Sequence, residues 1–183
     1  MIAARLKLAV DHVAPPPNDG QRRAAVAILL AANDVLLMER AKRDGDPWSG
    51  HISLPGGGYH ETDGDLCVTA MRETREEVGI ELAQHRYAGA LPALHPLSSG
   101  PAGVEVTPHV FVVEGVVPVP VLGAEAAGTF WFPLDRALAG EFDAEYEFVR
   151  AGTTMRFPSW RYENHTIWGL TWRILTELAA AAR

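Results

Sequence analysis

The first regular pattern in the chain is a pair of short apolar runs. They are RAAVAILLA at 23–31 and DVLLMER at 34–40, with Asn33-Asp34 at their junction. Runs of this length joined by turn-forming residues are typical of a β-hairpin. A polar loop, AKRDGDPWSG, then leads to HISL at 51–54, a further short strand candidate. This part of the chain therefore predicts strands built around a hairpin.

A helix is the next element that the pattern predicts. Asp65 is a favourable N-cap residue, and Gly79 is the residue type expected just past a helix end, so the helix should run from 66 to about 78. At about 100° per residue, one narrow stripe of this helix should face the core. The stripe contains Cys67, Met71, Thr74 and Val78.

The second half of the chain mixes strand and helix signals. Strand candidates lie at 86–94, 106–117 and 129–133, a short helix at 134–140, irregular strand at 146–162, and a last helix at 165–182. Asn164 is placed to cap that last helix, whose inner face would carry Trp168, Thr171, Trp172, Leu175, Leu178 and Ala179. Strands and helices do not alternate strictly and no internal repeat is visible, which favours an α+β sandwich with a mixed sheet.

The N-terminal segment differs from the rest. Residues 1–14 can form a short amphipathic helix, which the prolines of APPPND would end. We therefore expect an N-terminal extension over 1–21, followed by a single domain over 22–183. A chain of 183 residues that is 48% hydrophobic and 21% charged fits one such domain.

Charge and cysteine content narrow the possible partners and location. The formal net charge of −7 argues against nucleic-acid polymers, because phosphate backbones are bound by clustered cations. A small anionic ligand would need a metal ion or local arginines. Cys67 is the only cysteine, so no intrachain disulfide can form. No apolar run approaches the ~20 residues of a membrane span, and we expect a cytoplasmic protein that does not bind a membrane.

Three glutamates on the predicted helix form its candidate chemistry. Glu73, Glu76 and Glu77 fall within about 100° of one another, because spacings of three and four residues share a helix face, and Thr69 and Ala70 lie beside them. An acidic face paired with arginines, such as Arg72 with Glu76, is the ordinary interpretation. The alternative is a bound Mg²⁺ or Mn²⁺, since clustered carboxylates repel and hard cations prefer oxygen ligands.

A run of three glycines precedes this helix. Gly56, Gly57 and Gly58 follow Pro55, and alone they would indicate a tight turn. The alternative is a close approach of bare backbone to a metal ion or a phosphate. The combination of PGGG, a short acidic loop and RETREEVGI at a fixed distance favours this alternative.

This combination resembles the signature of the Nudix hydrolase family, G-x5-E-x7-R-E-U-x-E-E-x-G-U, where U is a bulky apolar residue. The matching residues are Arg72, Glu73, Glu76, Glu77, Gly79 and Ile80, with Thr74 a softer match at the first U. In one alignment Gly58 is the signature glycine and Gly64 takes the first glutamate position. In the other, with a loop one residue longer, Gly57 and Asp63 take these places.

The longer-loop alignment resembles the coenzyme A diphosphatase branch of that family. Segments from RRAAVAILL and GHISLPGG to HTIWGLTWRIL extend this likeness over roughly 22–178. The branch's upstream pattern is matched in part: Met38, Ala41 and Leu54 depart from it, and the spacer after Ala41 is longer by about one residue. Coenzyme A and other nucleoside diphosphate derivatives therefore both remain candidate substrates.

The resemblance implies an α/β/α sandwich and a reaction in which water attacks phosphorus in a substituted nucleoside diphosphate. It implies that Glu73 and Glu77 bind Mg²⁺ or Mn²⁺ directly and that Glu76 does so directly or through water. The carbonyl of Gly57 or Gly58 would be a further ligand, and Arg72 would orient a glutamate. Glu76 is one candidate for the general base, and a residue on a distant loop is the other.

The resemblance also suggests residues that touch the substrate. Arg40 is placed as a phosphate clamp, with an ordinary surface salt bridge as the alternative, and the bare backbone of Gly56 and Gly57 would lie against the ligand. Trp48 and His51 flank the glycine run and could contact a ligand or pack within their own loop. The expected partner is a small nucleotide-containing molecule, and proteins of this kind are often homodimers. A domain that binds nucleotide without catalysis is a further alternative.

Overall fold

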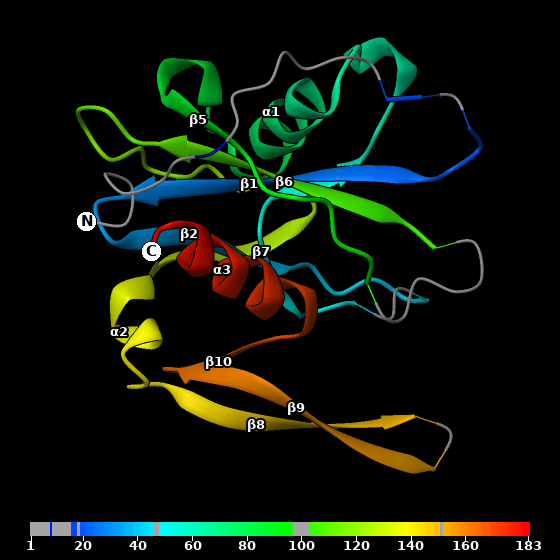
Figure 1. The fold of residues 1–183 in the computed structure, drawn as a ribbon, viewed down its shortest axis with the longest axis vertical. Coiled ribbons are helices and arrows are strands. Elements are labelled where there is room, and N and C mark those ends of the chain that lie inside the picture. The colour runs from blue at the N-terminus through cyan, green and yellow to red at the C-terminus, as the bar shows by residue number, and fades with distance from the viewer. Residues whose placement is uncertain (1–7, 9–15, 18, 46–47, 97–102, 151) are drawn as a thin grey trace.

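A large mixed sheet and a small antiparallel sheet organise the molecule (Figure 1). The computed structural model describes residues 8, 16–17, 19–45, 48–96, 103–150 and 152–183. Its elements are β1 (Arg23–Ala31), β2 (Asp34–Arg40), β3 (Ile52–Ser53), β4 (Gly56–Gly58), η2 (Glu61–Asp63), α1 (Leu66–Val78), η3 (Leu82–Gln84), β5 (Arg86–Ala90), β6 (Glu105–Val112), β7 (Ala126–Pro133), α2 (Leu134–Leu138), β8 (Asp143–Arg150), β9 (Thr153–Tyr162), β10 (His165–Trp168) and α3 (Gly169–Ala181). The helix expected over 1–14 lies almost wholly outside the described residues.

The predicted β-hairpin is confirmed and forms the centre of the large sheet. β1 and β2 pair antiparallel only near their turn, where Leu30 faces Val35 and Ala31 faces Asp34. Beyond the turn the two strands take different partners. β1 pairs parallel with β6 and antiparallel with β4, whereas β2 pairs antiparallel with β3 and β7. The large sheet is therefore mixed, as the sequence predicts.

Two hydrophobic cores lie on opposite faces of this sheet. Successive residues of a strand point to opposite faces, and β1 shows this directly. Ala27 and Leu29 pack in the core beneath α1, while Ile28 and Leu30 pack in the core shared with α3. In Figure 1, α1 lies above β1 and β6, and α3 lies below them towards the β8–β10 sheet. This arrangement is the predicted α/β/α sandwich.

Helix α1 has the bounds that its capping residues predict. The Asp65 carboxylate accepts a hydrogen bond from the Val68 amide at 2.8 Å, and Gly79 ends the helix with a φ of 67°. The predicted core stripe is buried at Cys67, Thr74 and Val78 and partly buried at Met71. Thr69, Ala70 and Glu77 are buried as well. The buried face is thus wider than one stripe, because α1 packs against both β1 and β4.

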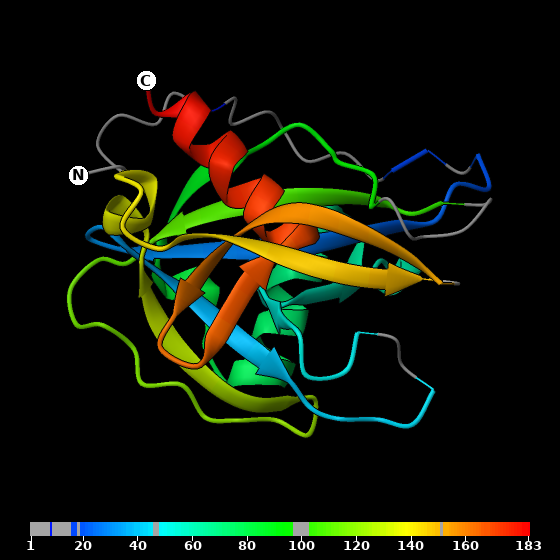
Figure 2. The same cartoon turned by 90° about the horizontal axis from the view of Figure 1, so that it is seen from below.

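The C-terminal third differs most from expectation. The irregular strand expected at 146–162 is a regular antiparallel hairpin of β8 and β9. The helix expected at 165–182 begins only at Gly169, because 165–168 pairs with β9 as the strand β10. Asn164 is therefore not a helix cap, and Trp168 occupies the N-cap position. Figure 2 shows this small sheet running across the molecule beside α3.

Smaller corrections concern strand ends. β6 stops at Val112 rather than 117, because the chain bends at Gly115, whose φ is 83°. β5 stops at Ala90, and only an isolated bridge from Leu94 to Val106 continues the extended segment expected to 94. In the described part of the chain, no helix is long and apolar enough to cross a membrane.

His109 on β6 is buried, with 2% of its surface exposed, and its Nδ1 lies 3.0 Å from the Tyr87 hydroxyl oxygen. Burial lowers its pKa from 6.5 to about 4. The unfolded chain therefore gains a proton at higher pH than the folded protein does, and the stability contributed by neutral His109 is lost as the pH falls from 6.5 towards 4. We expect a loss of about 3 kcal/mol in the free energy of unfolding over that window.

The measurement is urea unfolding at pH 7 and pH 4.5 for the unaltered protein and His109→Gln. Comparing the two proteins cancels other groups that titrate in the same range. The unaltered protein should lose more stability than the variant on acidification. An equal loss of stability in both proteins would contradict the lowered pKa of His109.

Candidate active site

Arg72 on α1 holds the acidic residues of the site together. Its Nε and Nη2 donate to the two carboxylate oxygens of Asp63 at 2.8 and 3.0 Å, and Nη1 donates to Glu73 at 2.8 Å. Nη1 also lies 3.3 Å from Glu76, the i, i+4 pair expected from the sequence, and Nη2 donates to the Gly58 carbonyl at 3.1 Å. One guanidinium thus fixes the loop, the glycine strand and the helix relative to one another.

Asp63, not Gly64, supplies the acidic group of the loop before α1. Its side chain is buried and accepts four hydrogen bonds, two from Arg72, one from the Thr69 hydroxyl and one from the His60 amide. The paired Arg72 guanidinium lowers the pKa of Asp63 to about 2, so this carboxylate is charged at neutral pH. Gly64 sits beyond it with a φ of 78°. The geometry favours the longer-loop alignment, with Gly57 and Asp63 in the signature places.

The glycine run is a strand, not the tight turn that a lone GGG would indicate. Gly56, Gly57 and Gly58 pair with Val26, Ala25 and Ala24 of β1. A Cβ atom on Gly57 would lie 2.5 Å from the Glu73 carboxylate carbon, and one on Gly56 would lie 2.3 Å from the Ala25 carbonyl oxygen. The missing side chains therefore allow the strand to lie against both a carboxylate and the neighbouring backbone.

Glu77 is the buried carboxylate of the site. Only 2% of its surface is exposed, and it accepts a hydrogen bond from the Gly56 amide at 2.8 Å. Burial raises its pKa from 4.5 to about 7, and the negative charges of Glu73 and Glu125 add to the rise. The Gly56 amide and the charge of Arg40 act in the opposite direction. A cation placed beside Glu77 would relieve this unfavourable burial of charge.

The three glutamates are not presented as one acidic patch. Glu73 and Glu76 bond to Arg72, while Glu77 points to the Gly56 amide. Across the described ranges, no group of three or more His, Cys, Asp or Glu side chains is gathered closely enough to hold a metal ion. The donors have the hard-oxygen chemistry that Mg²⁺ and Mn²⁺ prefer, and Glu73 lies close enough for its charge to raise the pKa of Glu77. Arg72 engages Oε1 of Glu73 and Oε2 of Glu76, so an ion shared by all three would bind the second oxygen of each of these carboxylates while Arg72 keeps them in place.

Arg40 is the last residue of β2, and His51 directly precedes β3. The Arg40 amide donates to the His51 carbonyl at 3.0 Å, and the Gly50 amide donates to the Arg40 carbonyl at 3.1 Å. The charge of Arg40 lowers the pKa of Glu77, so the guanidinium lies near this carboxylate. The His51 ring packs between Trp48 and Trp168, with centroids 5.7 and 5.3 Å away.

Glu125 is a site residue that the sequence did not single out. It lies on the loop before β7, and its carbonyl accepts a hydrogen bond from the Ala41 amide at 2.8 Å. The same loop is tied to the end of α1 by a hydrogen bond from the Gly123 amide to the Glu77 carbonyl at 2.8 Å. The half-exposed carboxylate of Glu125 lies 3.3 Å from the Arg43 guanidinium, and its charge raises the pKa of Glu77. No spacing in the sequence indicates this proximity.

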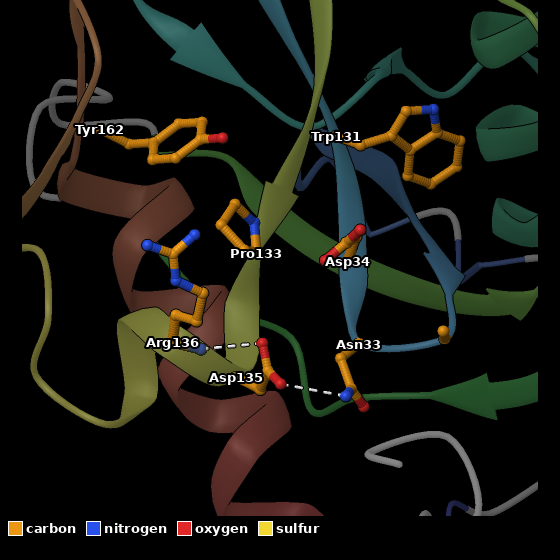
Figure 3. A pocket seen from close by; sticks show the side chains of 8 residues that line it. Asn33, Asp34, Trp131, Pro133, Asp135, Arg136 and Tyr162 are labelled. Carbon is orange, nitrogen blue, oxygen red and sulfur yellow. Dashed lines mark hydrogen bonds between the residues drawn. The ribbon is translucent and has the colours of Figure 1, made fainter.

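A separate cavity of about 500 Å³ lies at the turn between β1 and β2. Figure 3 shows Asn33, Asp34, Asp135, Arg136 and Tyr162 around it. The side-chain amide of Asn33 donates a hydrogen bond to the Asp135 carboxylate at 3.0 Å. Asp34 is at the opposite end of β2 from Arg40. None of the predicted site residues lines this cavity.

Asp63→Asn tests whether the Arg72 network positions the glutamates. The amide keeps an acceptor oxygen but removes the ionic, two-pronged pair, so we expect a loss of about 1–3 kcal/mol in the free energy of unfolding. Displacement of the carboxylates that Arg72 holds should lower turnover by about 10- to 100-fold. Asp65→Asn is the matched control, because asparagine is an equally good N-cap residue. Unchanged stability and turnover in Asp63→Asn would contradict this role.

The family model of the NUDIX domain matches residues 20–151. A Photorhabdus laumondii protein named "Uncharacterized Nudix hydrolase NudL" is 34% identical over 170 residues, covering 90% of this chain and 89% of its own. A Yersinia pestis protein of the same name is 37% identical over 161 residues, covering 86% of this chain and 78% of its own.

Solved structures show the same fold. An Ap4A hydrolase binary complex from C. elegans aligns with a TM-score of 0.53 at 19% identity, over 64% of this chain and 84% of that chain. The Nudix hydrolase RenU from M. smegmatis aligns with a TM-score of 0.52 at 20% identity, over 72% of this chain and 84% of that chain. The fold of the large sheet and its flanking helices is therefore shared with these proteins.

Proposed function

Since the chain belongs to the Nudix hydrolase family, we propose that it cleaves the diphosphate linkage of a small nucleotide-containing substrate with Mg²⁺ or Mn²⁺. The observation that carries this proposal is the glycine strand held against two carboxylates. Gly57 lies against Glu73, and the Gly56 amide binds Glu77, which is buried and costly to charge. A buried carboxylate next to a partly buried one, both beside bare backbone, suits a cation and a phosphate better than it suits a structural salt bridge.

Glu73 and Glu77 would hold the metal, with Glu76 as a direct or water-mediated ligand and the Gly57 carbonyl as a further one. When bound, the ion neutralises charge on the diphosphate and lowers the pKa of the attacking water. Arg72 then acts as a positioning residue, because its bonds to Asp63 and the Gly58 carbonyl keep the helix and the glycine strand in register. Arg40 would hold a phosphate oxygen beside Glu77.

Two carboxylates compete for the role of general base. Glu76 is more than half exposed and lies on the signature helix, so it reaches solvent beside the metal ligands. Glu125 lies on the loop before β7, and its charge raises the pKa of Glu77. Its loop position and half-exposed carboxylate favour Glu125 as the base if Glu76 is needed for the metal.

Coenzyme A or an acyl derivative is the proposed substrate, giving 3',5'-ADP and the corresponding 4'-phosphopantetheine product. The support is the likeness to the coenzyme A diphosphatase branch over roughly 22–178, together with Asp63 in the acidic place of the longer-loop alignment. ADP-ribose, nucleotide sugars and dinucleotides form the second candidate class, because Met38, Ala41 and Leu54 depart from the upstream pattern of that branch. Asp63 supplies a carboxylate at the first acidic position of the signature in the longer-loop alignment, which argues against a catalytically silent domain.

Product analysis tests the proposal. Coenzyme A and ADP-ribose are offered in parallel with Mg²⁺ or Mn²⁺, and the products are separated by chromatography and identified by mass spectrometry. Release of 3',5'-ADP from coenzyme A alone supports the first substrate, and cleavage of ADP-ribose alone supports the second. Cleavage of neither, nor of a wider panel of nucleoside diphosphate derivatives, would refute the proposed activity.

A further inference from the structure

Six aromatic rings outside the carboxylate site form one connected group, which we call the aromatic cluster. Trp168 is its centre, with its ring centroid 4.0 Å from Tyr146, 5.5 Å from Phe148, 5.8 Å from Phe157 and 5.3 Å from His51. Trp48 completes the cluster, 5.7 Å from His51 in an edge-on arrangement. The small sheet thus supplies four rings that support two rings of the loop between β2 and β3.

The outer end of the aromatic cluster is open to solvent. Trp48 is 36% exposed, whereas His51, Tyr146 and Trp168 are half-buried. Part of the Trp48 indole is thus accessible to a ligand, and its ring contact with His51 fixes its orientation in advance. A ring that is already oriented loses little conformational entropy when a flat ligand stacks on it.

The aromatic cluster is continuous with the proposed active site. The His51 carbonyl accepts from the amide of Arg40, the residue whose charge reaches Glu77, and the His51 amide donates to the Trp48 carbonyl at 3.1 Å. Only four residues lie between His51 and Gly56, so an extended chain would place them at most about 18 Å apart. A phosphate held by Arg40 would therefore lie beside the backbone from which the aromatic cluster starts.

From this continuity we infer that Trp48 stacks on the purine base of the substrate, with His51 and Trp168 as its supports. The inference rests on the proposed function and extends it to the base subsite. Adenine is the part that coenzyme A, ADP-ribose and adenine dinucleotides have in common, so the subsite fits every candidate substrate of that type. Neutral ring faces recognise a flat neutral base, while Arg40 and the metal ligands hold the phosphates.

The test measures binding without turnover. Dissociation constants for AMP and for ribose 5-phosphate, which has no base, are determined by calorimetry with Mg²⁺ for the unaltered protein and for Trp48→Ala, Trp48→Phe and Leu138→Ala. Alanine substitution of a stacking ring should weaken AMP binding by roughly 5- to 150-fold and leave ribose 5-phosphate within about twofold. Trp48→Phe should recover most of the affinity for AMP. Leu138 on α2 is 38% exposed, so Leu138→Ala controls for loss of a comparable apolar surface.

Three results would overturn the inference: no preference for AMP over ribose 5-phosphate in the unaltered protein, unchanged AMP binding in Trp48→Ala, or equal losses for both ligands. The binding readout is independent of the proposed activity. A protein that selects AMP through Trp48 but cleaves no diphosphate would keep the base subsite and refute the function. With an active substrate, Trp48→Ala should raise KM far more than it lowers kcat, because a remote base contact contributes mainly to binding.

Discussion

Replacement of Glu77 by glutamine is expected to lower turnover by more than about 100-fold, since outer-shell partners of a metal alone contribute 10- to 100-fold. The Glu77 carboxylate is buried beside Glu73, where a neutral amide offers a far weaker ligand to Mg²⁺ or Mn²⁺. Stability should respond in the opposite direction. Glutamine can still accept the hydrogen bond from the Gly56 amide. It also removes the buried carboxyl group of Glu77, whose pKa is raised to about 7. Without metal, the variant should be at least as stable as the unaltered protein.

Metal-dependent melting provides the second readout for this variant. An ion at 100 times its dissociation constant stabilises a folded protein by about 2.7 kcal/mol, and this gain should be reduced or lost in Glu77→Gln. Glu81→Gln is the matched control, because Glu81 is exposed and undergoes the same change of charge. If Glu77→Gln keeps the turnover and the metal response of the unaltered protein, Glu77 is not a metal ligand.

The parts of the fold that the sequence predicts correctly are those with local signals. The β1–β2 hairpin follows from two apolar runs around Asn33-Asp34, and α1 follows from its caps at Asp65 and Gly79. The three glutamates are predicted as a group because helical spacing alone places them on one side of α1. Their separate partners could not be predicted in the same way, because burial of Glu77 depends on packing against β4.

The errors arise where long-range pairing overrides a local preference. Asn164 has the side chain of a helix cap, but the four residues after Asn164 hydrogen-bond to β9 and delay the helix to Gly169. A triple glycine has a low intrinsic preference for strands, yet Gly56–Gly58 form one because β1 supplies the partner edge. In the same way, Glu125 reaches the site because hydrogen bonds from Gly123 to Glu77 and from Ala41 to Glu125 hold its loop there. None of these contacts has a fixed sequence spacing.

The glycine strand provides the second large effect. In Gly57→Ala, the added methyl group would lie 2.5 Å from both the carboxylate carbon and Oε1 of Glu73, closer than real Cβ contacts allow. Glu73 must then move from the position at which Arg72 holds it. Because Glu73 is a proposed metal ligand, we expect turnover to fall by about 10- to 100-fold or more. Stability should change less, since the clash is with the end of a side chain rather than with backbone.

Gly58→Ala separates this clash from a general effect of alanine in the strand. A Cβ atom on Gly58 would meet nothing within 4 Å, so this variant should keep near-normal turnover. Gly56→Ala should behave differently from both, because its methyl group would meet the Ala25 carbonyl oxygen and the Val26 Cα atom, and this backbone cannot yield cheaply. We therefore expect Gly56→Ala to unfold more readily than the unaltered protein. Gly57→Ala should fold but turn over slowly, and Gly58→Ala should keep both its stability and its turnover. Equal activity in Gly57→Ala and Gly58→Ala would show that Glu73 need not lie against Gly57 for catalysis.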